Sequence, residues 1–448
     1  MKRLILIVIV FTINLASAQT QIIIGWNDLG MHCSNRNFGG IVVLPPFNNV
    51  TAQVVTVGDA THLPRLVTSG FHVTYEIPGN TYSVGKTDFW NWEDQIFGVN
   101  LVDNVGLTGN GLSGTMTVET DHFSATGIPI TPFTDADLLH EDPFQLGLLK
   151  LFDASNTLLA TAQPVVPVSN EINCISTGCH VSEQDLLNKH DLVTGFDPNN
   201  TPILCANCHS SNALGTPGHP GVPSLSEAIH KAHGDRTNDC YKCHPGPNTQ
   251  CYRDVMKTRH GFTCQTCHGS VTQVGESISS GRIPWLQEPS CGATACHGSQ
   301  YAEEPGKLFR QSRGHGGLFC SACHGEPHAI VPSGNARDNV MNISLQGYAG
   351  TLNKCDVCHG VVPAQAGPHG QFASNCCVGL TGNIDCDATN QIDIADLTAL
   401  IDNLYISFTS LCCPAEANVD GQPGIDIADL TALIDYLYIS FALPASCQ

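Results

Sequence analysis

Residues 240–268 read CYKCHPGPNTQCYRDVMKTRHGFTCQTCH, and this stretch carries the motif that decides the fold. Two cysteines separated by two residues are followed at once by a histidine, and the pattern occurs here twice. In the whole sequence, C-x-x-C-H occurs five times and C-x4-C-H twice. In sequence order, motifs 1 to 7 are Cys174, Cys179 and His180; Cys205, Cys208 and His209; Cys240, Cys243 and His244; Cys264, Cys267 and His268; Cys291, Cys296 and His297; Cys320, Cys323 and His324; and Cys355, Cys358 and His359.

This spacing is the attachment signature of c-type haem. The two thiols add to the two vinyl groups of one porphyrin, and the adjacent histidine ligates the iron from the proximal side. Zinc ribbons are the alternative, but a zinc site does not need a histidine after every cysteine pair. Disulfides within the pairs are a third possibility. We predict seven haems c, with the fourteen cysteines as thioether anchors and the seven histidines as proximal iron ligands.

Histidines outside the motifs are the candidates for the second axial ligand. Met256 and Met341 are the only methionines in this region, so histidine and methionine together cannot be the general ligand set. His230 and His233 are three residues apart on a predicted helix and are expected to serve two haems. The eight distal candidates are His190, His219, His230, His233, His260, His315, His328 and His369, with His219 as the surplus one.

The mixture of C-x-x-C-H with C-x4-C-H over residues 171–372 resembles that of multihaem c-type cytochromes, in particular the cytochrome c3-type families. The resemblance implies closely packed haems that form most of the apolar interior and carry electrons. An iron with both axial positions filled by histidine passes electrons but does not readily bind a substrate. The alternative is a multihaem reductase of a nitrogen or sulfur oxyanion, which would need one open iron; the C-x-x-C-K variant known in related nitrite reductases is absent.

The sequence IDIADLTALID at residues 392–402 recurs letter for letter at 425–435. Oxygen-bearing side chains stand before and within each copy at positions 1, 3, 5, 9 and 12 of an EF-hand loop. We therefore predict up to two calcium ions, and the leucines that follow are expected to form a core between two paired helices. The predicted ligands are Asp385, Asp387, Thr389, Asp393 and Asp396 in the first loop, and Asn418, Asp420, Gln422, Asp426 and Asp429 in the second.

This tandem repeat resembles a type I dockerin, which has Asp at position 12 where other EF-hand loops have Glu. The resemblance implies an α-helical EF-hand-like pair that docks onto a cohesin-like partner. Thr389 and Gln422 depart from it, because Asp is usual at position 5. A calcium-stabilised cap without a partner is the alternative. Six cysteines in this tail predict disulfides that clamp its two halves.

Residues 19–170 contain one cysteine, Cys33, and many short β-prone runs separated by turn residues. Short strands at this spacing predict an all-β antiparallel sandwich. The runs are 21–24, 40–44, 52–57, 71–77, 114–119, 146–152 and 157–168.

The protein has 40 acidic and 19 basic residues, a net charge of -21, which argues against a nucleic-acid partner. Residues 1–18 have a basic start, an apolar run and an Ala-Ser-Ala cleavage site, so we predict a signal peptide. No later segment is apolar enough to span a membrane. We expect a periplasmic, extracellular or cell-surface protein of three domains at 19–170, 171–372 and 373–448. Its expected partners are other redox proteins or an extracellular electron acceptor, and self-assembly is possible.

Overall fold

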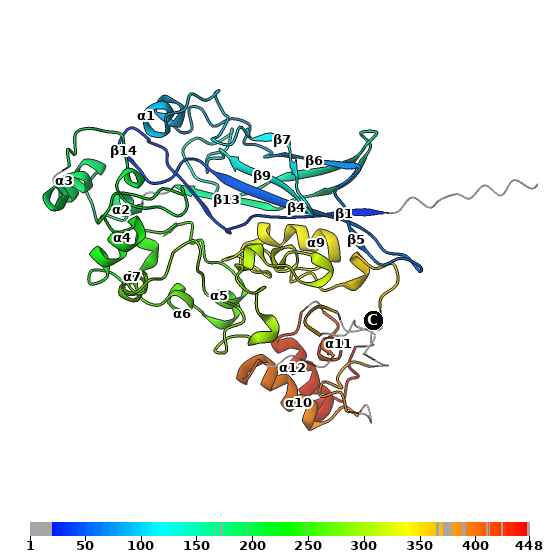
Figure 1. Cartoon of the computed structure of the whole chain (residues 1–448). Coiled ribbons are helices and arrows are strands. Elements are labelled where there is room, and N and C mark those ends of the chain that lie inside the picture. The colour runs from blue at the N-terminus through cyan, green and yellow to red at the C-terminus, as the bar shows by residue number, and fades with distance from the viewer. Residues whose placement is uncertain are drawn as a thin grey trace, which may run out of the picture.

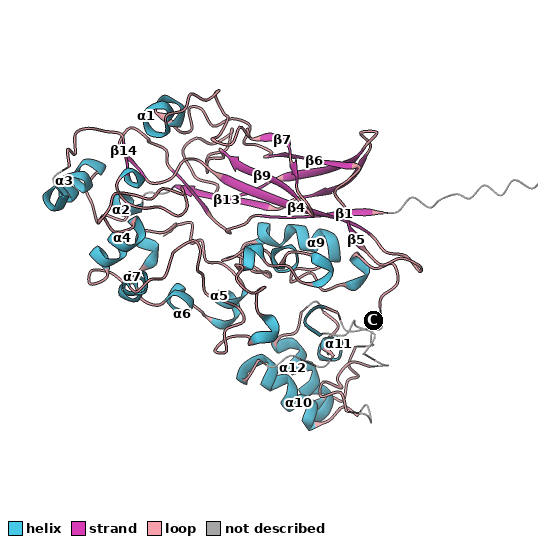
Figure 2. Cartoon of the chain, in the orientation of Figure 1, coloured by secondary structure: helices cyan, strands magenta, loops and turns pink. Residues whose placement is uncertain are grey.

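The computed structural model describes residues 20–445, apart from 171–172, 195, 247, 364–366, 371–376, 378–379, 388–390, 409–410, 412 and 423. The predicted signal peptide and Thr389 lie outside the described residues. A β-rich N-terminal region is followed by a loop-rich region with short helices and then by a small helical region (Figures 1 and 2). No helix in the described ranges is long and apolar enough to cross a membrane.

The strands are confined almost entirely to the first 170 residues (Figure 2). They are β1 Gln21–Trp26, β2 His32–Ser34, β3 Ile41–Val42, β4 Asn48–Thr56, β5 Arg65–Leu66, β6 Phe71–Glu76, β7 Ser113–Thr115, β8 Thr117–Val118, β9 Phe123–Ile128, β10 Phe144–Leu146, β11 Leu148–Asp153, β12 Leu158–Ala162, β13 Val165–Asn170 and β14 Ile203–Leu204. One short helix, α1 (Glu93–Phe97), lies among them.

Two antiparallel sheets dominate this region. One has the order β1-β4-β9-β8 with β5 added on β4, and the other has the order β12-β11-β6-β7. Two smaller sheets, β10-β13-β2 and β14-β3, each contain a parallel pair. Ile23 and Val54 of the first large sheet are buried in one cluster with Tyr75 and Leu149 of the second. Burial of these alternating apolar side chains between the sheets is what stabilises the region.

The predicted β-prone runs all contain strands, but the runs 114–119, 146–152 and 157–168 are each split in two, and β2, β5 and β9 lie outside every predicted run. The run 157–168 forms β12 and β13 rather than one strand, because Pro164 has no N–H to donate to a ladder between them. The strand β9 was not predicted from the sequence FSATGI, since Ser124, Ala125 and Gly127 have little β propensity. It forms because Phe123, Ala125 and Ile128 are buried against β4.

The middle region contains only short helices. They are α2 Asn173–Ser176, α3 Glu183–Thr194, α4 Leu225–His233, α5 Val255–His260, α6 Cys264–His268, α7 Val271–Ser279, α8 Cys320–His324 and α9 Val340–Gln346. Part of this region packs on the β-rich region: Leu318 and Phe319 share a buried cluster with Ile24 and Trp26 of β1. The rings of Phe319 and Trp26 are 5.4 Å apart. The two regions therefore share a hydrophobic core, which the sequence analysis did not foresee.

The C-terminal region contains α10 (Ile394–Ile401), α11 (Pro414–Ala417) and α12 (Ile427–Ile434). The identical helices α10 and α12 each run into a π-helical turn, at Asp402–Ile406 and Asp435–Ile439. Leu400 and Leu433 are fully buried between them, so the predicted leucine core is confirmed. Cys377, Cys386 and Cys413 are in disulfide bonds, whereas Cys376, Cys412 and Cys447 lie outside the described residues.

Candidate cofactor-binding site

Each C-x-x-C-H motif forms a single helical turn. The histidine N–H donates to the carbonyl of the first cysteine, as from His209 to Cys205 at 3.0 Å and from His359 to Cys355 at 2.9 Å. Residues i, i+3 and i+4 lie on one face of such a turn, so the two thiols and the imidazole point to the same side. In motif 5, with its longer loop, His297 still bonds to the carbonyl of Cys291, at 3.2 Å. The backbone bond from the histidine to the first cysteine is therefore kept in the longer loop.

The motif thiols are not paired with each other as cystines where their state is described. Free thiols are found at Cys179, Cys208, Cys240, Cys264, Cys267, Cys291, Cys296, Cys320, Cys323, Cys355 and Cys358. The side chain of Cys174 lies outside the described residues. Within the described ranges, no group of three or more His, Cys, Asp or Glu side chains forms a site that could hold a metal ion by itself. Cys251, which belongs to no motif, is also a free thiol, and burial raises its pKa to about 11.

Six of the seven motif histidines face the imidazole of a second histidine from elsewhere in the protein. The distances between ring centroids fall between 5.9 and 6.4 Å. The pairs, in motif order and with the motif histidine first, are His180 and His233, His209 and His190, His244 and His230, His268 and His328, His324 and His369, and His359 and His315.

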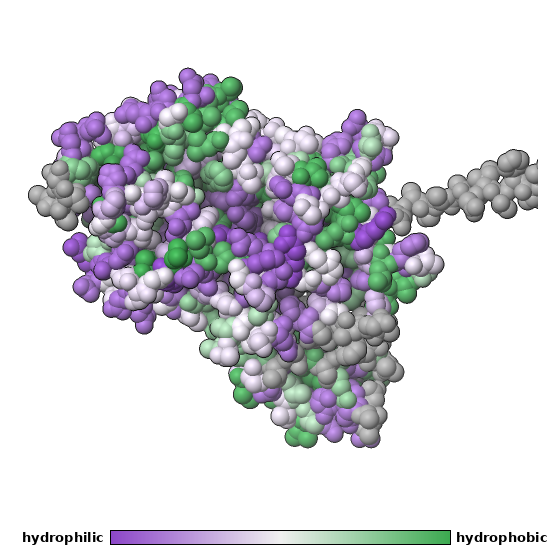
Figure 3. All heavy atoms as spheres, in the orientation of Figure 1, coloured by the Kyte–Doolittle hydropathy of each residue, from purple (hydrophilic) through white to green (hydrophobic). Residues whose placement is uncertain are grey.

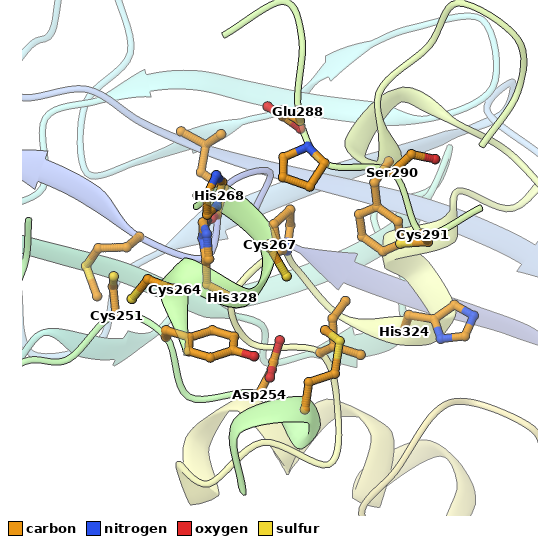
Figure 4. Close-up of a pocket in the computed structure, with 18 of the residues that line it drawn as sticks. Cys251, Asp254, Cys264, Cys267, His268, Glu288, Ser290, Cys291, His324 and His328 are labelled. Atoms are coloured by element: carbon orange, nitrogen blue, oxygen red, sulfur yellow. Dashed lines mark hydrogen bonds between the residues drawn. The ribbon is translucent and has the colours of Figure 1, made fainter. Parts of the chain in front are cut away.

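This spacing is too wide for stacked rings in contact and fits one metal ion between two imidazoles. A metal–nitrogen bond is about 2.0 Å long and the ring centroid lies about 1.1 Å behind the nitrogen, so two imidazoles on one ion have centroids about 6.2 Å apart. All six pairs lie close to that value. Figure 4 shows one pair, His268 and His328, facing each other next to Cys264 and Cys267.

Hydrogen bonds at Nδ1 orient several of these rings. The Nδ1 of His230 lies 2.7 Å from the carbonyl of Ser226, that of His233 lies 2.8 Å from the carbonyl of Ile229, and that of His209 lies 2.8 Å from the carbonyl of Pro223. Because a carbonyl only accepts, each Nδ1 must donate, and in the neutral ring the lone pair is then on Nε2. Such outer hydrogen bonds are typical of metal-binding histidines. The carbonyls carry no signal in the sequence, which is why sequence reasoning did not find them.

Burial keeps three of the paired imidazoles neutral. Desolvation, helped by neighbouring histidines, lowers the pKa values of His244, His324 and His328 to about 4. The neutral imidazole is the form that ligates a metal. Only the neutral form is therefore expected in these sites at physiological pH.

One branched cavity of about 4180 Å³ connects the motifs and is lined by their cysteines and histidines. It amounts to about 600 Å³ for each motif, which is within the range of about 300–1,000 Å³ for one small-molecule site. The cavity explains why residues 171–372 have few buried apolar side chains of their own. The donor set, the spacing of the imidazoles and the cavity volume all fit haem c.

Contacts between motifs define a spatial order. Motifs 3 and 4 meet where Cys240 and Cys264 share a hydrogen bond. The electrostatic contacts of Cys267 with Cys296, of Cys291 with Cys320, and of Cys323 with Cys358 continue the series from motif 4 through 5 and 6 to 7. In Figure 4, Cys291 lies beyond Cys267 on the side of His324.

Helices α3 and α4 extend this order at the other end. His233 and His230 are on α4 and face motifs 1 and 3, as predicted for two histidines on one helical face. Helix α3 carries His190, the partner of motif 2, and Asp185, which is 3.5 Å from His180 of motif 1. The motifs therefore follow one another as 2, 1, 3, 4, 5, 6 and 7.

Two of the eight predicted distal histidines do not face a motif histidine. The backbone N–H of His219 donates to the carbonyl of Cys208 at 2.8 Å, in the loop after motif 2. The ring of His260 contacts Phe262 and Phe408 instead. The prediction that His219 is the surplus histidine agrees with this arrangement. The prediction that His260 is a distal ligand does not, because its ring lies against two phenylalanines. His297 of motif 5 has no imidazole opposite it among the described residues.

Histidines of the N-terminal region interact with carboxylates rather than with motif histidines. The Nε2 of the buried His32 lies 2.8 Å from Asp28, so the nitrogen that would face a metal is already engaged. His122 and His140 bond through the other ring nitrogen: the Nδ1 of His122 lies 2.8 Å from Asp121 and that of His140 lies 2.9 Å from Asp137, whereas the ring of His72 stacks on Phe152. Such pairing explains why histidine content alone does not identify the site.

The two acidic loops of the C-terminal region are built around position 12. In the first loop, Asp396 is buried and accepts the N–H groups of Asp385 and Asp393. In the second, Asp429 accepts those of Asp420 and Asp426. Asp387 lies beside Asp385, its N–H donating to that carboxylate, and the exposed Gln422 bonds to Asp420 in the same way.

Two features of the second loop fit a cation. The buried Oδ1 of Asn418, at position 1, has no hydrogen-bond partner. Burial raises the pKa of Asp429 to about 6, because the charged carboxylate is poorly solvated there. A cation bound next to it would stabilise the charged form. Burial also raises the pKa of Asp396 in the first loop. An oxygen-only donor set of this kind suits calcium.

Comparison with models of protein families and with curated proteins finds no match for this sequence.

Proposed function

We propose that the protein is an exported multihaem c-type cytochrome that transfers electrons through seven covalently bound haems. The fourteen motif cysteines anchor the porphyrins, the seven motif histidines are the proximal ligands, and six further histidines fill the distal positions. Haem c supplies reversible one-electron chemistry when bound. The protein's own contribution is to hold the groups in series and to orient several of the axial imidazoles through their Nδ1 bonds.

The observation that carries this proposal is the recurrence of one geometry. Six separate imidazole pairs have centroids 5.9 to 6.4 Å apart, and each stands on a C-x-x-C-H or C-x4-C-H turn. Zinc ribbons would bring two cysteine pairs around one ion, and no such convergence is present in the part of the protein that the structure describes. Cystines within the motifs do not account for the paired imidazoles or for the cavity between them.

The experiment is an intact mass of the purified holoprotein together with its optical spectrum. We expect seven haem masses on the mature polypeptide and a reduced spectrum dominated by low-spin haem c. A colourless protein, or one that carries zinc or intramotif cystines, would contradict the proposal. The same mass locates the signal-peptide cleavage site predicted after Ala18.

The order of the motifs supports electron relay rather than storage at isolated centres. The thiols of successive motifs influence one another electrostatically from motif 4 to motif 7, which supports the proposal that the attached porphyrins are neighbours in series. The two ends of the series, motifs 2 and 7, are the places for exchange with a redox partner or an extracellular acceptor. We infer that the β-rich region, proposed to be a sandwich, is the scaffold of this series.

The tail is proposed to be a dockerin-like calcium-binding pair that anchors the protein. Each copy exposes the same apolar side chains at equivalent positions: Ile394 and Ile427, Tyr405 and Tyr438, Ile406 and Ile439, Phe408 and Phe441. Figure 3 shows apolar atoms at the surface of this region. Repeated apolar exposure is typical of a docking face. A calcium-dependent pull-down with a cohesin module tests it; no binding with calcium present would leave only the role of a structural cap.

A further inference from the structure

Motif 5 differs from the other six in the group that faces its histidine. His297 has one ring contact, with Tyr301 at 6.0 Å, and Tyr301 also lies 4.9 Å from His369, the histidine opposite motif 6. A phenolate that ligated an iron opposite His297 would put the two ring centroids about 8 Å apart, since the oxygen stands well away from its ring. Tyr301 is therefore too close to His297 to be its partner on one iron, and it lies next to the histidine opposite motif 6.

Three other side chains able to ligate iron are engaged elsewhere. His219 belongs to the loop at motif 2, at the far end of the motif order. The ring of His260 contacts Phe408 of the C-terminal region at 5.2 Å. The sulfur of Met341 accepts the N–H of Gly25 at 3.1 Å inside the shared hydrophobic cluster.

The charges around motif 5 indicate which ligands fit. Its basic neighbours are ion-paired: Lys307 with Glu304 at 2.8 Å and Arg310 with Glu288 at 3.4 Å. The carboxylate of Glu303 accepts the N–H of Cys291 at 2.7 Å and has no ion pair within the described residues. This leaves a negative charge next to the motif, which disfavours an anionic ligand and does not affect a neutral one.

We propose that the position opposite His297 carries no protein ligand and binds a small neutral molecule of the carbon monoxide, nitric oxide and dioxygen class. The inference rests on the proposed function, because the site requires haem c on Cys291 and Cys296. Five-coordinate iron with a proximal histidine is the arrangement that binds such diatomic ligands. The site lies inside the motif order, so electrons can reach it from motif 4 and from motif 6.

The test is carbon monoxide titration of the reduced full-length holoprotein after its mass has confirmed seven haems. We expect one carbon monoxide bound per protein molecule and, in the oxidised protein, a high-spin electron paramagnetic resonance signal from one haem in seven. His328→Gly, which removes the partner of His268, should raise the stoichiometry to two. A protein without haem refutes the proposed function itself, whereas seven haems that are all low-spin and bind no carbon monoxide refute only this inference.

Two further measurements separate the remaining explanations. If His260 or Met256 were a hidden ligand, the unaltered protein would bind no carbon monoxide, and His260→Ala or Met256→Leu would bind one; that result overturns the proposal. Nitrite is the anionic probe for the same iron in the oxidised protein. We expect nitrite to leave the high-spin signal unchanged at concentrations that saturate with nitric oxide, and tighter binding of nitrite would contradict the assigned ligand class.

Discussion

Arg253 joins three parts of the molecule, and its replacement by methionine tests how they hold together. Its guanidinium bonds Asp338 through two nitrogens at 2.7 and 2.8 Å, and it donates to the carbonyls of Gly30 and Cys251. Glu326 lies 3.9 Å away. Gly30 belongs to the β-rich region, Arg253 lies before motif 4, and Asp338 lies after motif 6. Arg253 therefore links the β-rich region to two segments of the middle region.

The expected loss follows from burial. Arg253 is 6% exposed and Asp338 7% exposed, so Arg253→Met leaves a carboxylate without its counter-charge inside the protein. Breaking a buried pair from one side costs about 3–5 kcal/mol. Arg337 provides the control, because it also bridges the two regions through Asp142, but with side-chain exposures of 44% and 34%. Exposed pairs of this kind contribute about 0–1 kcal/mol.

The assay is guanidinium denaturation of the holoprotein, followed by far-ultraviolet circular dichroism. We expect Arg253→Met to lower the unfolding midpoint strongly and Arg337→Met to lower it little, with unchanged slopes. Equal losses in the two variants, or a loss below about 1 kcal/mol for Arg253→Met, would refute the argument that the buried contact holds the regions together. Arg253→Lys should fall between the two, because it keeps the charge and loses the two-pronged contact with Asp338.

Three other outcomes are expected. His233→Ala should convert one haem in seven to high spin, because it removes only the imidazole opposite His180; optical and electron paramagnetic resonance spectra measure this, and an unchanged spectrum would contradict the pairing. Calcium affinity, measured by titration calorimetry, should fall about tenfold for each pH unit below 6, because the carboxylate of Asp429 then binds a proton in place of the cation, and a flat profile would exclude it as a ligand. His328 is neutral in the folded protein, because burial lowers its pKa to about 4, and in the unfolded polypeptide it takes up a proton below its ordinary pKa of 6.5; stability should therefore fall as the pH drops below 6.5 and stay level for this group above it, as denaturation at stepped pH would reveal.

The sequence predicts the local chemistry of this protein better than its long-range arrangement. The C-x-x-C-H spacing is contained within one helical turn, and the pair His230 and His233 within one helix, so both follow from local rules. The partner of each motif histidine does not, because His328 and His268 are 60 residues apart and nothing local relates them. That His297 faces no second imidazole among the described residues could not be predicted for the same reason: eight spare histidines for seven motifs indicate a surplus, but only the fold decides which of them lie opposite a motif.

The β-rich region makes contacts at both ends of the motif order, and this would explain its presence in the proposed electron carrier. At one end, β14 pairs with β3 directly before Cys205 of motif 2. At the other, Gly58 donates to the carbonyl of Cys358 in motif 7 and accepts from Gly360, while Phe319 beside motif 6 packs on Trp26. The middle region has few apolar side chains that could pack together and hold its motifs at fixed distances. The paired sheets, in contrast, form a densely packed core. Holding the first and last motifs of the order on that core fixes the distance between them, so the separation of the successive centres does not depend on the loops that join them.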